Sequence, residues 1–159
     1  MWVSAHRKVS LNQGDVSMTP TSLIVRRVKV DRIRANSEVV RATRRNCYVE
    51  GPVLAKMPTG EGDEVEMTFF KLSRDVSDCQ LEREYDLRAL KADPRAQAAI
   101  NEDDPAFADD NPNATHWRGA DGEWCYTTFS RWKDSRNMGV YSSGGRGWDD
   151  YWFFGGVPK

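Results

Sequence analysis

The feature most clearly missing from this sequence of 159 residues is a long hydrophobic segment. A membrane-spanning helix needs about 18 or more consecutive apolar residues, and no window of the sequence approaches that length. The stretch 1–17 also has no apolar run of the kind that forms the centre of a signal peptide. We therefore expect a soluble, cytoplasmic protein that is not secreted and makes no contact with a membrane.

Cysteine is also scarce. The three cysteines, Cys47, Cys79 and Cys125, lie 32 and 46 residues apart, which matches neither a disulfide framework nor the short spacings of a zinc site. Scattered cysteines of this kind are usually small buried hydrophobic residues. We therefore expect reduced thiols, which fits a reducing compartment, and we expect neither a metal ion nor another cofactor.

The supply of catalytic residues is small as well. The two histidines are His6, near the N-terminus, and His116. A cysteine nucleophile needs a neighbouring base, and a predicted hairpin would place His116 and Cys125 on adjacent strands. The glycine-rich segment SSGGRG (142–147) lacks the Lys-Ser/Thr ending of a phosphate-binding loop. We therefore expect a protein that is not an enzyme, and a small enzyme using Cys125 and His116 is the catalytic alternative.

Charge is present in both signs but is unevenly distributed. Residues 1–50 carry 10 Lys and Arg against 4 Asp and Glu, a net charge of +6. Residues 51–115 carry 7 against 15, a net charge of −8, and residues 116–159 carry 6 against 5, a net charge of +1. This distribution is compatible with a nucleic acid at one end, with protein neighbours, with self-association, or with blocks that compensate each other after folding.

The N-terminal part of the chain predicts an arm followed by strands. Residues 1–20 show no periodicity and are predicted to form an N-terminal arm, with Met18 as an alternative start of the folded part. The segment 22–34 alternates valine with arginine and lysine, which is typical of a half-buried strand. A second strand is predicted over 47–57, interrupted by a glycine-proline pair, and a third over 65–73.

Helices are predicted in the middle of the chain. Ser77 followed by Gln80 is a capping-box pattern, and the segment 77–91 has no helix breaker. An aspartate-proline pair predicts a short second helix over 94–100. The segment 101–116 is rich in acidic residues and is expected to be a long solvated loop.

The first predicted helix has apolar residues on two sides. The stripe expected to face the core consists of Val76, Cys79, Leu87 and Leu90. Leu81 and Tyr85 fall on the opposite side. A single core needs one stripe, so Leu81 and Tyr85 become candidates for contact with a partner.

The C-terminal third predicts two β-hairpins. One turns at Asp121 and Gly122, and the other has three glycines and Arg146 in its connection. In the run 151–154, successive side chains of a strand alternate faces, so part of this aromatic run should face outward unless the strand is covered on both sides. The fold class is therefore predicted as α+β: a β-rich single domain over 21–159, with three N-terminal strands, one or two helices and C-terminal hairpins, in an order that an OB-like barrel would also have.

The function favoured by these patterns is binding of another protein, or self-association, without catalysis. Aromatic residues and arginine are the usual anchors of protein interfaces. The predicted contact residues are Arg146, Trp148, Tyr151, Trp152, Phe154, Leu81 and Tyr85. The protein would then be an assembly component or an accessory or inhibitor protein, and a viral protein is one hypothesis for its source.

The alternative is an OB-like module that binds single-stranded nucleic acid. Such modules combine a basic groove with aromatic rings on which bases stack. The residues that would serve this function are Arg27, Lys29, Arg32, Arg44, Arg45, Trp117 and Trp124.

Overall fold

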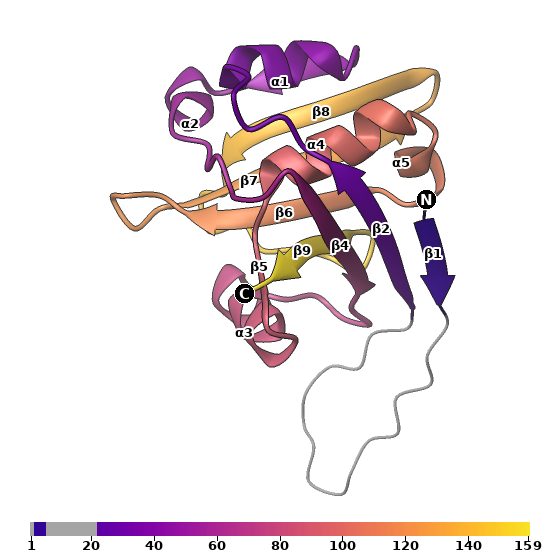
Figure 1. Ribbon diagram of the computed structural model, residues 1–159. Helices are drawn as coiled ribbons and strands as arrows, with labels where there is room; N and C mark the ends of the chain where they lie inside the picture. Colours follow the sequence, from indigo (N-terminus) through magenta and orange to yellow (C-terminus); the bar gives the residue numbers. More distant parts are fainter. Residues whose placement is uncertain (1, 6–21) are drawn as a thin grey trace, which may run out of the picture.

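The computed structural model of the protein describes residues 2–5 and 22–159 (Figure 1). Within the predicted arm 1–20, residues 2–5 form strand β1 (Trp2–Ala5). The rest of the arm, including Met18, lies outside the described residues.

Nine strands and five helices follow one another along the described parts of the chain. After β1, the strands are β2 (Leu23–Lys29), β3 (Asn46–Val49), β4 (Glu64–Lys71), β5 (Leu90–Lys91), β6 (Asn113–Arg118), β7 (Trp124–Trp132), β8 (Ser135–Ser142) and β9 (Phe153–Pro158). The helices are α1 (Asn36–Ala42), α2 (Gly51–Ala55), α3 (Asp78–Leu87), α4 (Pro94–Asp103) and α5 (Phe107–Asp110). The fold is therefore of the mixed α+β class, as predicted.

Eight of the strands form one open sheet in the order β1-β2-β4-β9-β6-β7-β8-β3, and β5 pairs with β9. Most neighbours are antiparallel, but β3 runs parallel to β8 and β9 runs parallel to β6. An OB-like order is not found, since the sheet stays open and β9 lies in its middle.

Strand β9 is packed closely on both faces. A Cβ atom on Gly155 would lie 2.7 Å from Cε1 of Phe69, and a Cβ atom on Gly156 would lie 2.9 Å from Cβ of Leu90. Glycine is therefore required at both positions because no larger residue fits without displacing a core side chain. Phe153 and Phe154, the preceding residues of β9, are both buried and belong to different core clusters. The strand is thus covered on both sides, so these two adjacent rings do not need an outward-facing position.

One face of the sheet is covered by α1, α2, α4 and α5 (Figure 1). Ile100 of α4 and Phe107 of α5 pack there against Phe69 of β4. Next to them, Val39 and Val40 of α1 belong to the cluster formed around β7 and β8. This face supplies two of the three apolar clusters of the core.

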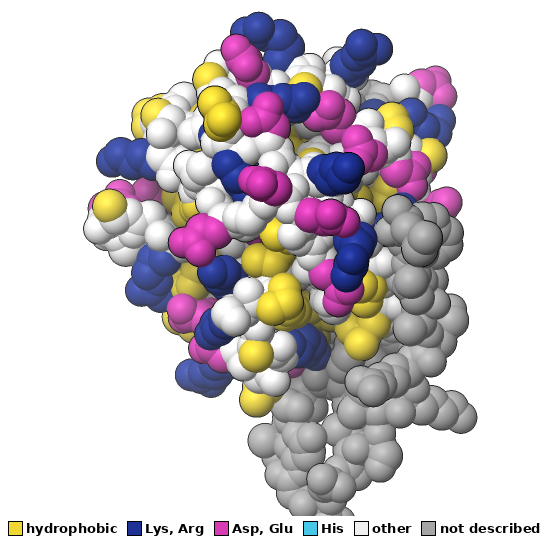
Figure 2. Space-filling view, in the orientation of Figure 1, with side chains coloured by type: hydrophobic (Ala, Val, Ile, Leu, Met, Phe, Trp, Pro, Cys, Tyr) yellow, Lys and Arg dark blue, Asp and Glu magenta, His cyan; other side chains and the backbone are white. Residues whose placement is uncertain are grey.

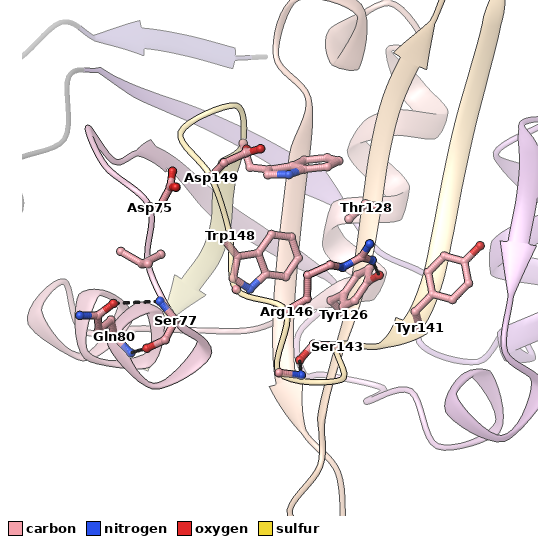
Figure 3. A pocket seen from close by; sticks show the side chains of 14 residues that line it. Asp75, Ser77, Gln80, Tyr126, Thr128, Tyr141, Ser143, Arg146, Trp148 and Asp149 are labelled. Atoms are coloured by element: carbon pink, nitrogen blue, oxygen red, sulfur yellow. Dashed lines mark hydrogen bonds between the residues drawn. The ribbon is translucent and has the colours of Figure 1, made fainter.

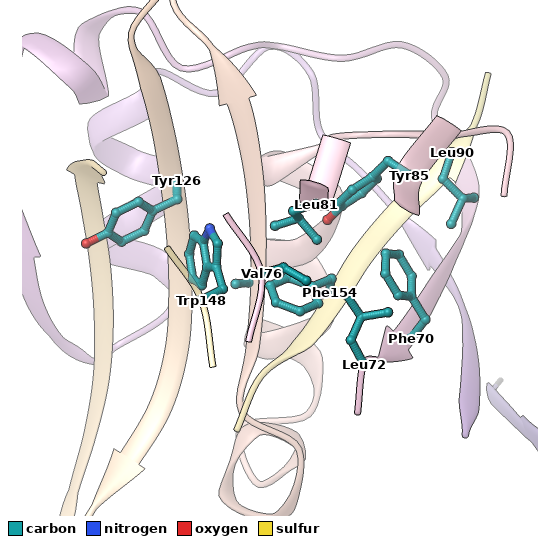
Figure 4. Packing of buried hydrophobic residues seen from close by; sticks show 10 residues of the cluster. Phe70, Leu72, Val76, Leu81, Tyr85, Leu90, Tyr126, Trp148 and Phe154 are labelled. Carbon is teal, nitrogen blue, oxygen red and sulfur yellow. The ribbon is translucent and has the colours of Figure 1, made fainter. Parts of the chain in front are cut away.

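The opposite face is covered over part of its width by α3. Leu81 and Tyr85 of α3 lie in one cluster with Phe70, Phe154 and Trp148 (Figure 4). Farther along this face, over β7, β8 and β3, the described helices provide no cover. The side chains of β7 and β8 that point this way are mostly half-buried, whereas the central ones on the helix-covered face, Cys125, Thr127, Phe129, Met138 and Val140, are buried.

Local sequence signals are confirmed where they depend on a few adjacent residues. Helix α3 has the predicted capping box, in which the Gln80 amide donates to Ser77 Oγ and the Ser77 amide donates to Gln80 Oε1. Asp93 caps α4 by accepting a hydrogen bond from the Ala96 amide at 3.0 Å. The tight turn around Gly122, at φ 81°, joins β6 to β7 as predicted.

Two predicted elements are wrong in part, and one helix was missed. The strand predicted over 47–57 ends at Val49, because Pro52 sits in the first turn of α2, where a missing N–H costs nothing. The segment 101–116 is not a loop: α4 continues to Asp103, α5 buries Phe107, and β6 begins at Asn113. Helix α1, between the first two predicted strands, was not predicted.

The second C-terminal hairpin and the faces of α3 are also corrected. Strand β8 pairs with β7 and β3, not with β9, so the glycine-rich connection is a loop that crosses between distant strands. On α3, Leu81 and Tyr85 are buried, while Cys79 and Leu87 are exposed, which reverses the predicted orientation. Both sides of α3 carry apolar residues, so the helix sequence alone does not determine which side meets the sheet.

Candidate functional site

A cleft of about 750 Å³ opens on the sheet face that α3 leaves uncovered (Figure 3). Its floor is formed by Tyr126 and Thr128 of β7 and by Tyr141 of β8. One wall is the loop 143–152, and the other is the segment leading into α3. The cleft thus lies where three distant parts of the chain meet.

A continuous chain of aromatic contacts begins at Tyr151, beside the cleft, and continues through four rings that line it. Ring centroids are 5.0 Å apart between Tyr151 and Trp152, and 6.0 Å apart between Trp152 and Trp148. The chain continues to Tyr126 at 5.1 Å from Trp148, and to Tyr141 at 5.8 Å from Tyr126. We call these five residues the aromatic belt. It combines large apolar area with polar tips, the composition that interfaces favour.

The belt contains both buried and accessible rings. Trp148 is 8% exposed and anchors the belt in the core, whereas Tyr151 is 46% exposed. Tyr48 on edge strand β3 is 55% exposed and lies opposite Gly139 in the register, two residues from Tyr141. Accessible aromatic rings therefore extend from the loop to the edge of the sheet.

Arg146 lies within the cleft. Its Nη2 atom donates a hydrogen bond of 3.0 Å to the hydroxyl of Tyr126, and within the described residues it forms no ion pair (Figure 3). The carboxylates that line the cleft are Asp75 and Asp149. One cation beside two anions makes the cleft a poor site for a polyanion.

Glycines allow the loop to reach the start of α3. Gly144, Gly145 and Gly147 have φ angles of 62°, 75° and 77°, in the left-handed region that favours glycine. The loop then pairs with the segment before α3 through two backbone hydrogen bonds. The Val76 amide donates to the Trp148 carbonyl at 2.8 Å, and the Trp148 amide donates to the Val76 carbonyl at 2.7 Å.

Asp78, in the first turn of α3, fixes the loop from below. Its carboxylate accepts hydrogen bonds from Ser143 Oγ at 2.5 Å and from Trp148 Nε1 at 2.9 Å. His116 Nδ1 lies 3.6 Å from Asp78 Oδ1. Asp78 is 5% exposed, so one buried carboxylate holds both ends of the segment that carries Arg146. The belt is therefore preorganised.

This arrangement predicts a loss of stability in acid. Burial by itself raises the pKa of Asp78, but the interactions with His116, Ser143 and Trp148 outweigh it and leave the pKa below its usual value. An unfolded aspartate has a pKa of about 3.9, so the stabilising charge is fully present above that pH and is lost as the pH falls through the lower folded pKa. We expect the free energy of unfolding, measured with urea over a pH series, to fall in this acidic window and to fall less in Asp78→Asn. Parallel pH curves for the two proteins would contradict this.

The predicted pair of Cys125 and His116 is not formed. His116 is paired with Tyr126 in the register, and Cys125 with Trp117, so the two side chains point to opposite faces of the sheet. His116 is instead stacked between Trp124, at 4.4 Å, and Tyr85, at 5.3 Å. Burial raises the pKa of Cys125, which disfavours the reactive thiolate.

The residues predicted for nucleic-acid binding are dispersed. Arg27 and Lys29 on β2 lie opposite Glu66 and Glu64 on β4, which offset their charge. Figure 2 shows that basic and acidic side chains also alternate over the face that carries α1 and α4. A strand rich in arginine and lysine therefore does not produce a basic strip.

Other members of that set hold the fold together. Arg32 forms a two-point ion pair with Asp93 and donates to the carbonyls of Thr59, Glu61 and Gly62. Arg45 and Trp117 are buried, and Trp124 lies between His116 and the guanidinium of Arg118. Arg44 is exposed.

The residues predicted for partner contact divide into two layers. Arg146, Trp148, Tyr151 and Trp152 come together around the cleft, whereas Phe154, Leu81 and Tyr85 lie beneath it in the core. The last three cannot contact a partner. Tyr126 and Tyr141, which complete the belt, were missed because strand pairing, not their local sequence, brings them to the cleft.

The described residues contain no group of three or more His, Cys, Asp and Glu side chains arranged to hold a metal ion. No helix in the described ranges combines the length and apolar character required to cross a membrane. Comparison with protein-family models, with curated proteins and with solved structures finds no match.

Proposed function

We propose that this chain is a non-catalytic binding protein that holds another protein on the aromatic belt. The observation that carries the proposal is the continuous contact from Tyr151 to Tyr141 across an open cleft, with Arg146 beside it. Tyrosine, tryptophan and arginine dominate the energetics of protein interfaces because they bury large areas and still satisfy polar atoms at their tips.

The rigidity of the site supports the same function. Asp78 fixes Ser143 and Trp148, and Trp148 in turn packs against Tyr126 and Trp152. A surface whose side chains are already held in place loses little conformational entropy when a partner binds. The more accessible rings, Tyr151 and Tyr48, would then form the rim that a partner meets first.

Charge favours a protein over a nucleic acid as the partner. The positive charge of Arg146 is offset in the cleft by the carboxylates of Asp75 and Asp149, and the positive charge of the basic residues of β2 is offset by glutamates of β4. A phosphate backbone would be repelled by such carboxylates, whereas a protein surface of mixed charge would not.

The test is Trp152→Ala, with Arg146→Ala as a second variant. Removing an anchor residue from the centre of an interface costs about 2 kcal/mol or more, so we expect partner affinity to fall at least about 30-fold. The measurement has two steps. The tagged protein captures partners from its native host, and the affinity of the captured protein for each variant is then measured by surface plasmon resonance.

Trp132→Ala is the matched control, because Trp132 is 70% exposed at the far end of β7 and does not line the cleft. Its variant should bind like the wild type. Equal losses in Trp132→Ala and Trp152→Ala would sink the proposal. So would capture of an oligonucleotide whose binding quenches tryptophan fluorescence and weakens steeply with salt.

A further inference from the structure

A second pocket, of about 430 Å³, lies on the helix-covered side of the sheet. It is lined by the end of α1 and the residues that follow it, by Glu102 of α4, by Pro105 between α4 and α5, and by Arg136 at the start of β8. Arg136 and Tyr141 are five residues apart in β8, and side chains an odd number of residues apart in a strand point to opposite faces. Arg136 therefore projects from the face opposite the aromatic belt. This pocket is therefore separate from the cleft.

Arg45, which lines the pocket, is a buried cation that forms no ion pair with a described carboxylate. It is 9% exposed, and its Nη2 atom donates to the carbonyl of Pro105 at 2.8 Å, while its guanidinium lies 5.3 Å from the ring centroid of Phe129. Its Nε atom is buried and has no hydrogen-bond partner among the described atoms. Burial, and then the positive charge of Arg136, lower the pKa of Arg45, and the Asp109 carboxylate, which Arg131 and Arg136 already share, offsets this only in part. A buried charge without a counter-charge is costly unless something supplies one.

The acidic side chains around the pocket already form ion pairs with other arginines. Asp109 pairs with Arg131 and Arg136, Glu102 pairs with Arg34, and Asp104 pairs with Arg26. After these pairs are made, no ion pair joins Arg44 or Arg45 to a carboxylate in the described part of the chain. The pocket therefore has an excess of positive charge.

Arg44 is a second cation on the lining of the pocket. Its φ angle is 56°, in the left-handed region that disfavours residues other than glycine and asparagine. The side chain is exposed and lines the pocket next to Arg45. Arg44 directly follows Thr43, the C-cap of α1, where a left-handed residue is a common way for a helix to end and glycine is the usual residue.

We propose that this pocket binds the phosphate group of a small phosphorylated molecule, with Arg44 and Arg45 as its principal ligands and Arg136 at its side. A guanidinium presents parallel N–H donors that match two phosphate oxygens. A phosphate monoester carries a charge of about −1.5 to −2 at neutral pH, which offsets the two cations that no carboxylate neutralises. The pocket is large enough for a phosphate and a small attached group.

The experiment compares inorganic phosphate and a sugar phosphate with chloride at equal ionic strength. Binding to the full chain is followed through the melting temperature and through the Nε–Hε resonance of Arg45 in NMR spectra. We expect a saturable rise in melting temperature with phosphate and a shift of the Arg45 resonance. A tighter response to the sugar phosphate would identify an ester as the ligand, and an equal response would identify the free ion.

Arg44→Gly is the informative variant because glycine relieves the left-handed backbone and should not unfold the protein. It is expected to weaken phosphate binding by about tenfold or more, as loss of a hydrogen bond to a charged group does. Arg83→Ala, which removes an exposed arginine of α3, should bind like the wild type.

Two results would overturn the proposal. The first is a phosphate response no larger than that of chloride, or one that is the same in Arg44→Gly and in wild type. The second is binding of a single-stranded oligonucleotide that depends on Arg44 while phosphate and the sugar phosphate do not bind. In that case the pocket would contact a nucleic-acid backbone and not a single phosphate group.

Discussion

Replacing Asp78 with alanine will lower the free energy of unfolding by about 3–5 kcal/mol, the range seen when one member of a buried charged network is removed. The variant leaves the hydroxyl of Ser143 and the indole N–H of Trp148, two residues that are each only 8% exposed, without their acceptor. Each unsatisfied buried donor costs about 1–3 kcal/mol, and the cavity left by the carboxylate adds to this.

Urea denaturation at neutral pH measures the effect. Asp75→Ala is the matched control, since Asp75 is exposed, lies three residues earlier in the chain and also lines the cleft. We expect its free energy of unfolding to stay within about 0.5 kcal/mol of wild type. If the two variants lost the same stability, Asp78 would not be the anchor of the loop. Under conditions where Asp78→Ala remains folded, it should also bind the partner of the aromatic belt more weakly, because Trp148 is no longer held.

Asn113→Ala will lower the free energy of unfolding by about 2–4 kcal/mol. Asn113 belongs to a polar network between α4 and the sheet, whose members Gln97, Asn101, Asn113 and Thr127 are all fully buried. Its Oδ1 atom accepts from Gln97 Nε2 and from Asn101 Nδ2, each at 3.0 Å. Alanine removes both bonds and leaves two amide donors short of an acceptor in the core.

The control for this variant is Asn137→Ala, the same change on half-buried residue Asn137 of β8. It is expected to cost less than about 1 kcal/mol, as exposed polar positions usually do. A small effect at Asn113 would mean that water or a rearranged amide replaces the lost acceptor. Simultaneous replacement of Asn113 and Asn101 by leucine would then distinguish replacement by water from replacement by a rearranged amide, because water cannot form hydrogen bonds with two apolar side chains.

The parts of the fold that could be predicted are those determined by neighbouring residues. The capping box at Ser77 and the turn at Gly122 depend on the conformations of a few adjacent positions, and both are found. The orientation of α3 was predicted wrongly because both sides of the helix carry apolar residues. The choice between Leu81 and Leu87 depends on a sheet whose strands come from both ends of the chain.

The same division holds for the candidate site. Arg146, Trp148 and Trp152 could be selected because they are close in sequence and of the residue types that form interfaces. The roles of Asp78 and Tyr126 could not be predicted in this way. These two residues lie 70 and 22 residues away from Trp148 in the chain, and only folding brings them into contact with it. The charge pattern misled for a related reason: the basic residues of β2 acquire acidic neighbours when β4 pairs with it.

The position of β9 has a consequence for how the protein is made. During synthesis, β9 emerges after every other described strand, yet it lies between β4 and β6 in the finished sheet. Until then β4 and β6 lack the neighbour that they share in the finished sheet, and each has an unpaired edge that carries residues buried in the folded protein, such as Phe70 of β4 and Ala114 of β6. Such edges are prone to pair with other chains, and contacts between residues far apart in sequence form slowly. The complete sheet can therefore form only after β9 has been synthesised, and until then the edges of β4 and β6 are open to pairing with other chains.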